Sequence, residues 1–201
     1  MARKKTVDVK VIVTDASPIL TLSRIGRLDL LGTFEPSVVV VDQVYFEVTR
    51  RENDPDGLVA AGLNRLGNKV QVVETNIGAG FRLRRQSDPK TRSGGLGELA
   101  VQEYIGLLAD TSTPSESFLV LFEDPDILDL PFWRLKKVHF LNTTAWLFGL
   151  YEDGNLPEGL TLIDRINAMR RTPMNPIDRE ARTKSIKSTW RRRIRKDEDD
   201  A

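Results

Sequence analysis

Residues 11–20 read VIVTDASPIL, and this stretch combines a strand, a carboxylate and the start of a helix. The β-branched run over residues 9–14 is bounded by polar residues and predicts a buried strand. Asp15, followed shortly by Pro18, predicts that a helix begins there. Asp15 therefore lies at the carboxyl end of a strand, which is where open parallel sheets gather their ligands and chemistry.

Further short apolar runs alternate with helical patterns along the chain, and this alternation predicts parallel strand pairing. Strands are expected at 38–41, 70–73, 118–122 and 138–141, and further helices at 43–51, 58–66, 93–109, 126–135, 142–151 and 158–170. Between Asn76 and Arg92, the residues Gly78, Gly80 and Pro89 predict a loop, which is strongly basic. The expected fold is an α/β three-layer sandwich with a central, mostly parallel five-stranded sheet.

Composition excludes several classes of site. The chain of 201 residues has no cysteine and a single histidine, His139, which excludes thiolate metal sites and multi-histidine zinc sites. No apolar stretch approaches the ~20 residues of a membrane span, and the basic start precedes too short an apolar run for a signal peptide. We therefore expect a soluble, cytoplasmic protein with no membrane contact.

The C-terminal part differs in composition from the rest. Residues 178–196 contain nine Lys or Arg and two acidic residues, a local excess of +7, with few apolar side chains. Such a stretch cannot bury a core, so residues 173–201 are expected to form a basic, disordered tail after a compact domain over residues 1–172.

Four acidic residues are predicted at or near strand ends: Asp15, Glu47, Glu98 and Asp124. Each has a purely structural interpretation, as a helix cap for Asp15, a favourable charge at a helix N-terminus for Glu98, and a solvated position for the others. Taken together, carboxylates gathered at one edge repel one another unless a cation lies among them. An all-oxygen site of this kind favours Mg²⁺ or Mn²⁺, which predicts a metal-dependent phosphodiesterase.

The order of these segments resembles that of PIN-domain nucleases. Residues 11–20 resemble the first strand and first acid of that family, and residues 38–47 resemble its second strand and second acid. Gly97-Glu98-Leu99-Ala100 is similar to a helix of the branch that includes VapC-like toxins. Residues 119–124 and 138–147 resemble the two last strands, so the likeness extends over about residues 9–170.

The resemblance implies a site and a reaction. Asp15, Glu47, Glu98 and Asp124 would be the catalytic acids, with Asp15, Glu98 and Asp124 as ligands of Mg²⁺ or Mn²⁺ and Ser17 in a supporting position. The chain departs from the family at Glu123-Asp124-Pro125 and at Asn142, where glycine is frequent. The fourth acid therefore stays open between Asp124, Glu123 and Asp126, and an altered activity stays open too.

Basic residues would bring an anionic substrate to these acids. Arg82, Arg84 and Arg85 precede Glu98 in sequence and are candidates for substrate binding, with solvated surface as the alternative. The resemblance implies a ribonuclease with an RNA substrate, a cognate antitoxin protein and a homodimeric state. The alternative is an RNA-binding protein without catalysis on the same scaffold. A phosphate-binding protein of the GxxxxGK[ST] kind is disfavoured, because that motif is absent.

Overall fold

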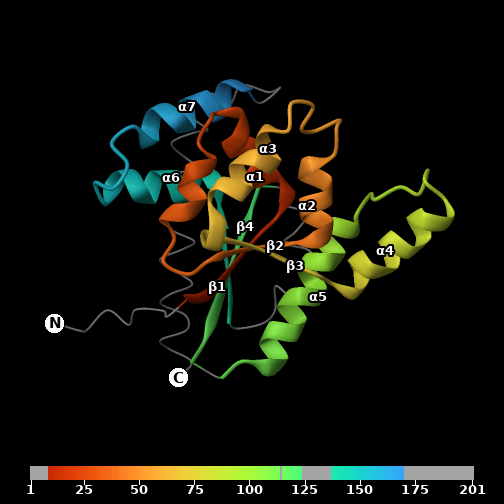
Figure 1. The fold of residues 1–201 in the computed structure, drawn as a ribbon. Coiled ribbons are helices and arrows are strands. Elements are labelled where there is room, and N and C mark those ends of the chain that lie inside the picture. Colours follow the sequence, from red (N-terminus) through yellow and green to blue (C-terminus); the bar gives the residue numbers. More distant parts are fainter. Residues whose placement is uncertain (1–8, 114, 124–136, 170–201) are drawn as a thin grey trace. The chain divides into compact units, whose positions relative to one another are not determined.

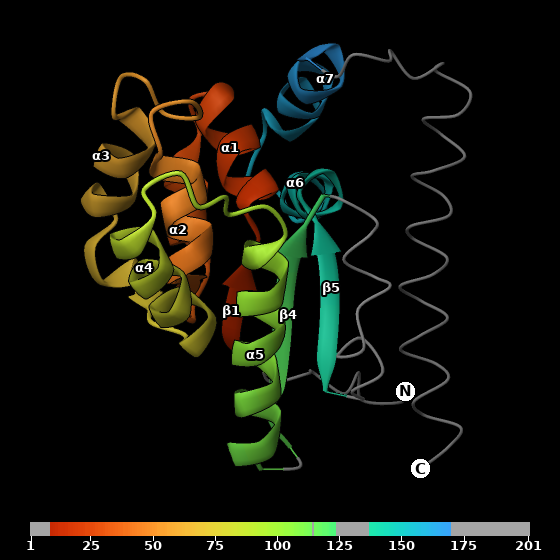
Figure 2. The same cartoon turned by 90° about the vertical axis from the view of Figure 1, so that its right-hand side faces the viewer.

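The computed structural model describes residues 9–113, 115–123 and 137–169. The chain divides into two compact units, residues 1–143 and residues 144–201. The first unit contains a five-stranded sheet in the order β3-β2-β1-β4-β5 (Figure 1). Every pairing in this sheet is parallel, so the predicted α/β fold is confirmed, and helices flank the sheet as expected for a three-layer sandwich (Figure 2).

The elements of the first unit follow the predicted alternation. The strands are β1 (Val9–Thr14), β2 (Val38–Val41), β3 (Val70–Val73), β4 (Ser117–Phe122) and β5 (Val138–Asn142). The helices between them are α1 (Ala16–Arg24), α2 (Asp42–Thr49), α3 (Leu58–Arg65), α4 (Asn76–Ser87) and α5 (Leu96–Thr111). Two short 3₁₀ helices, η1 (Leu28–Thr33) and η2 (Gly67–Lys69), precede β2 and β3.

The core lies around the central strands. All four valines of β2 are buried, which is the pattern of a parallel strand covered on both faces. Helix α1 packs on β4, and α2 and α5 both pack on β2. The parallel register brings the carboxyl ends of all five strands to one edge, where the helices α1, α2 and α6 begin.

Helix α4 corrects the prediction of a loop over residues 76–92. Residues Asn76–Ser87 are helical, and Thr75 caps the helix by accepting a hydrogen bond from the N–H of Gly78 at 3.0 Å. Gly78 is a packing residue here, because a Cβ at this position would overlap the carboxylate of Asp42. Gly78 is present because α4 approaches the start of α2 closely. The sequence pattern could not distinguish a glycine needed for close packing from one that ends a helix.

The described part of the second unit consists of α6 (Thr143–Glu152), whose first residue belongs to the first unit, and α7 (Gly159–Met169). Gly159 lies so close to α6 that an added Cβ would stand 2.8 Å from the Leu147 carbonyl oxygen. The helix predicted at 126–135 and the tail predicted at 173–201 lie outside the described residues. Among the residues that are described, no helix is both long and apolar enough to cross a membrane.

We predict that Gly78→Ala lowers the free energy of unfolding by about 2–3 kcal/mol, because the new methyl group displaces the buried Asp42 carboxylate. Urea unfolding measures the effect. Gly80→Ala in the same helix is the matched control: nothing lies within 4 Å of its added Cβ. This control is expected to be neutral or stabilising by up to about 1 kcal/mol. Equal effects of the two substitutions would contradict the proposed contact.

Candidate functional site

Asp15 follows β1 directly at the carboxyl edge of the sheet. Its backbone N–H donates to the Leu121 carbonyl oxygen at 3.0 Å, which extends the pairing between β1 and β4 by one residue. Asp15 occupies the N-cap position of α1, yet its side chain makes no capping hydrogen bond. The residue is only 6% exposed. The carboxylate is therefore buried at the start of α1 without a capping hydrogen bond.

Glu47 and Glu98 come from two helices that contact each other. Glu47 lies in the second turn of α2 and is half-buried, whereas Glu98 lies in the first turn of α5 and is exposed. Between them stands Gly97: a Cβ there would be 3.2 Å from Glu47 Oε2 and 3.5 Å from Val44 Cγ2. The small residue that precedes Glu98 thus allows α5 to approach the Glu47 carboxylate.

Electrostatics link the three carboxylates. Burial raises the pKa of Asp15 to about 6, and the charges of Glu98 and Glu47 act in the same direction. The backbone N–H groups of Ala16 and Ser17 oppose this rise in pKa. The pKa of Glu47 is also raised, first by burial and then by the charge of Glu98, while Arg50 lowers it. The charge of Glu98 therefore acts on both Asp15 and Glu47, and the charge of Glu47 acts on Asp15.

The donor atoms at this place suit a hard divalent cation, since all are carboxylate oxygens and their charges are incompletely balanced. Within the described ranges, however, no three acidic or histidine side chains form a group close enough to hold a metal ion. The predicted fourth acid, Asp124, and its alternative Asp126 lie outside those ranges. The described residues fit a cation in charge and chemistry, and they do not by themselves complete a coordination shell.

Glu123 directly follows β4, the strand that pairs with β1. Its Oε2 accepts a hydrogen bond of 2.8 Å from the Thr21 hydroxyl of α1. This contact ties the β4 end to the helix that starts at Asp15. Ser17, predicted to support the first acid, is half-buried in the first turn of α1 and acts on Asp15 through its backbone N–H.

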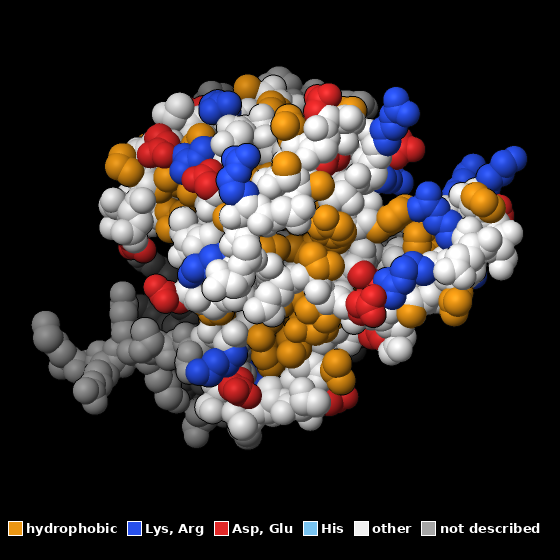
Figure 3. Space-filling view, in the orientation of Figure 1, with side chains coloured by type: hydrophobic (Ala, Val, Ile, Leu, Met, Phe, Trp, Pro, Cys, Tyr) orange, Lys and Arg blue, Asp and Glu red, His pale blue; other side chains and the backbone are white. Residues whose placement is uncertain are grey.

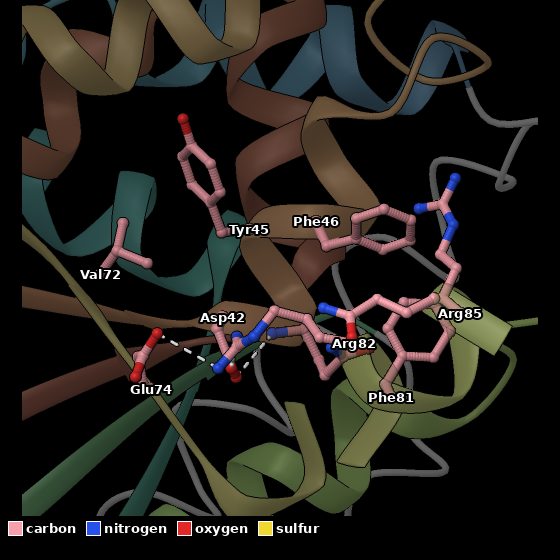
Figure 4. A pocket seen from close by; sticks show the side chains of 10 residues that line it. Asp42, Tyr45, Phe46, Val72, Glu74, Phe81, Arg82 and Arg85 are labelled. Carbon is pink, nitrogen blue, oxygen red and sulfur yellow. Dashed lines mark hydrogen bonds and ion pairs between the residues drawn. The ribbon is translucent and has the colours of Figure 1, made fainter. Parts of the chain in front are cut away.

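A second buried acid, Asp42, was missed by the sequence analysis. Asp42 follows β2 directly, as Asp15 follows β1, and this shared position was the signal that could have identified it. Its carboxylate accepts hydrogen bonds from the Thr75 hydroxyl at 2.7 Å and from its neighbour's backbone, the N–H of Gln43, at 3.0 Å. It also forms an ion pair of 2.7 Å with Arg82 (Figure 4). Asp42 is thus fully engaged within the fold.

The three predicted substrate arginines therefore have different surroundings. Arg82 bridges Asp42 and Glu74, at 2.7 and 3.2 Å, and so joins α4 to the ends of β2 and β3. Arg85 lies over the ring of Phe46, with its guanidinium carbon 4.7 Å from the ring centroid. Arg84 is exposed. Among the described residues, neither Arg84 nor Arg85 has an acidic partner within ion-pair distance.

Residues 11–84 match a family model described as a PIN domain. The matched segment contains β1, β2 and β3 with Asp15 and Glu47, and it ends before Glu98. The match supports the PIN-domain resemblance over this part of the chain. No curated protein and no solved structure matches the sequence.

We predict that the metal-free protein loses stability as the pH rises from about 4 to about 6. The folded Asp15 carboxyl holds its proton more tightly than the unfolded one, whose pKa is near 3.8. The free energy of unfolding therefore falls through this window, by up to about 3 kcal/mol, and the loss is complete above the folded pKa. Urea unfolding at a series of pH values in the presence of a chelator measures it.

Asp15→Asn removes the titrating group, so this variant is expected to be more stable than the wild type at pH 7 without divalent ions. Asp56→Asn, at an exposed position, is the control and should keep the wild-type pH dependence. An Asp15→Asn variant with the wild-type slope would show that Asp15 is not the strained carboxyl.

We further predict that Arg82→Ala lowers the free energy of unfolding by about 1–3 kcal/mol, because it leaves the buried Asp42 carboxylate without its cation. Arg84→Ala, in the same helix and exposed, should change it by no more than about 0.5 kcal/mol. Chemical denaturation of both variants tests the difference. A neutral Arg82→Ala would contradict the structural role of this ion pair.

Proposed function

We propose that the protein is a metal-dependent ribonuclease that hydrolyses RNA phosphodiester bonds. The observation that carries this proposal is the buried Asp15, whose pKa is raised to about 6 by burial and by the charges of Glu98 and Glu47. A fold gains no stability from holding such a carboxylate among like charges. A bound cation would attract these carboxylates and offset their repulsion. The PIN-domain match over residues 11–84 agrees with a metal-binding role for the site.

The proposed roles of the acidic residues follow from their positions. Asp15, Glu98 and the predicted Asp124 would hold Mg²⁺ or Mn²⁺, and Glu47 would complete the acidic set from α2. When bound, the cation lowers the pKa of a water and offsets charge on the phosphate oxygens. Asp15 has to give up its proton for the site to carry full charge, and its pKa near 6 makes this deprotonation almost complete at pH 7. The burial of its carboxylate also excludes bulk water on that side.

Arg84 and Arg85 are the candidates for guiding the RNA backbone, since Arg82 is held by Asp42 and Glu74. Both lie on α4, which packs against the acid-bearing helix α5. Phosphate binding by such side chains is independent of sequence and weakens with salt. The preference for RNA over DNA comes from the PIN-domain resemblance.

In this proposal the protein acts in the cytoplasm as the toxin of a toxin–antitoxin pair. A cognate antitoxin protein would keep it inactive, and the active form would be a homodimer. These partners follow from the VapC-like resemblance of residues 97–100, which lie beyond the segment matched to the family.

A second candidate is an RNA-binding protein without catalysis. It is favoured by one observation, that the described acids do not form a complete metal-binding group. The two candidates differ in the need for metal: binding through Arg84 and Arg85 would persist in chelator, whereas hydrolysis would stop.

The test is cleavage of single-stranded RNA by the purified full-length chain. We expect cleavage with Mg²⁺ or Mn²⁺, none in excess chelator, and a loss of at least about a hundredfold in kcat/KM for Asp15→Asn. Because Asp15→Asn is expected to be more stable than the metal-free wild type, this loss would not reflect unfolding. Asp56→Asn serves as the control and should cleave at the wild-type rate. Cleavage by Asp15→Asn at the wild-type rate would reject the ribonuclease proposal.

A further inference from the structure

A surface cavity of about 500 Å³ lies against α2, α4 and β3, outside the acidic site. Tyr45 and Phe46 of α2, Phe81 and Arg85 of α4 and Val72 of β3 line it (Figure 4). None of the acids Asp15, Glu47 and Glu98 borders it. Its volume is in the range of small-ligand sites and is ample for one planar heterocycle.

The aromatic residues of this cavity form a fixed platform. The rings of Phe46 and Phe81 lie 5.1 Å apart, centroid to centroid, at an interplanar angle of 58°. Phe81 is buried, so it holds Phe46 in place from below, while the Arg85 guanidinium lies over the Phe46 ring at 4.7 Å. Aromatic rings joined to an arginine plane are the surfaces on which nucleobases stack.

The cavity is acidic on one side and basic on the other: Asp42 and Glu74 line it together with Arg82, which pairs with both, and the free basic side chains lie on the α4 side. Figure 3 shows hydrophobic side chains gathered over β3 and Lys and Arg side chains gathered over α4. Arg84 and Arg85 form no ion pair with any described acid, so their charges are available to phosphates. The aromatic part of the cavity therefore suits a base, and Arg84 and Arg85 on the α4 side suit the adjoining phosphates, whereas the side with Asp42 and Glu74 does not.

We propose that this cavity binds an unpaired nucleobase of the RNA substrate, in a nucleotide close to the cleaved phosphate. The inference rests on the proposed ribonuclease function and adds to it a subsite for one base of the single-stranded RNA substrate. The cavity residue Phe46 and the acid Glu47 are consecutive in α2, with Cα atoms ~3.8 Å apart. Consecutive residues of a helix point roughly 100° apart around its axis, so an RNA strand has to follow the surface of α2 to reach both.

The experiment measures the affinity of RNA oligomers for the full-length Asp15→Asn chain by fluorescence anisotropy in Mg²⁺, with one abasic nucleotide moved along the oligomer. We expect one position at which the missing base weakens binding roughly tenfold. Adding Phe46→Leu, which keeps an apolar side chain but removes the ring, should abolish the difference between the intact and abasic oligomers. Leu83→Ala is the control: Leu83 is 64% exposed on α4, does not line the cavity and should preserve the difference.

The abasic series on Asp15→Asn alone does not depend on whether the Phe46→Leu variant folds. Affinity that is insensitive to every abasic position would overturn the inference. Equal base dependence with and without the Phe46 ring would also overturn it, because the base would then bind elsewhere.

The outcomes also separate this inference from the ribonuclease proposal. If wild-type protein cleaves RNA while binding is insensitive to the base, the inference alone fails. If binding depends on the base but no cleavage occurs, the cavity assignment stands and the ribonuclease proposal fails. Absence of RNA binding rejects both.

Discussion

Burial of the Asp15 carboxylate at the carboxyl edge of the sheet, with two further carboxylates nearby, is the constraint on which the site depends. Asp15 is held in place by its strand, because its own N–H continues the pairing of β1 with β4. Glu47 and Glu98 are brought toward it by the close packing of α5 against α2 at Gly97. Burial first, and then the charges of Glu98 and Glu47, raise the pKa of Asp15, so the shift follows from how these elements pack.

An aspartate directly follows each of the neighbouring strands β1 and β2, and the surroundings of these two aspartates differ. Asp42 after β2 receives a hydroxyl, a backbone N–H and a guanidinium, so its charge is compensated by the protein itself. Within the described part of the chain, Asp15 after β1 is contacted by the backbone N–H groups of Ala16 and Ser17, and the charges of Glu98 and Glu47 act against it. A buried carboxylate with partners is stabilised within the fold, whereas burial near like charges raises the pKa of a carboxyl. The contrast separates an acid whose charge the protein compensates from one whose charge it does not, at equivalent positions after two strands.

The same network explains how α4 comes to lie beside the acidic site. Arg82 and Gly78 fix this helix on Asp42, and Glu103 of α5 binds its N-terminus by accepting hydrogen bonds of 3.0 Å from the N–H groups of Asn76 and Ile77. With α4 fixed in this way, Arg84 and Arg85 are presented to solvent and Phe81 is turned inward against Phe46. Arg82 thus fixes α4 in place, and Arg84 and Arg85 of the same helix remain exposed.

Short-range patterns were enough to predict the strands, most helices and the parallel α/β class, because alternating apolar runs and cap residues act over only a few positions. The same patterns identified Asp15 at a strand end and Glu98 behind a small residue. They could not predict α4, since Gly78 is read locally as a helix breaker and its reason is a carboxylate 36 positions earlier in the chain. Nor could they separate Asp42 from Asp15 or Arg82 from Arg84. Those distinctions depend on which side chains from distant segments come into contact, because only such contacts decide whether a charge has a partner.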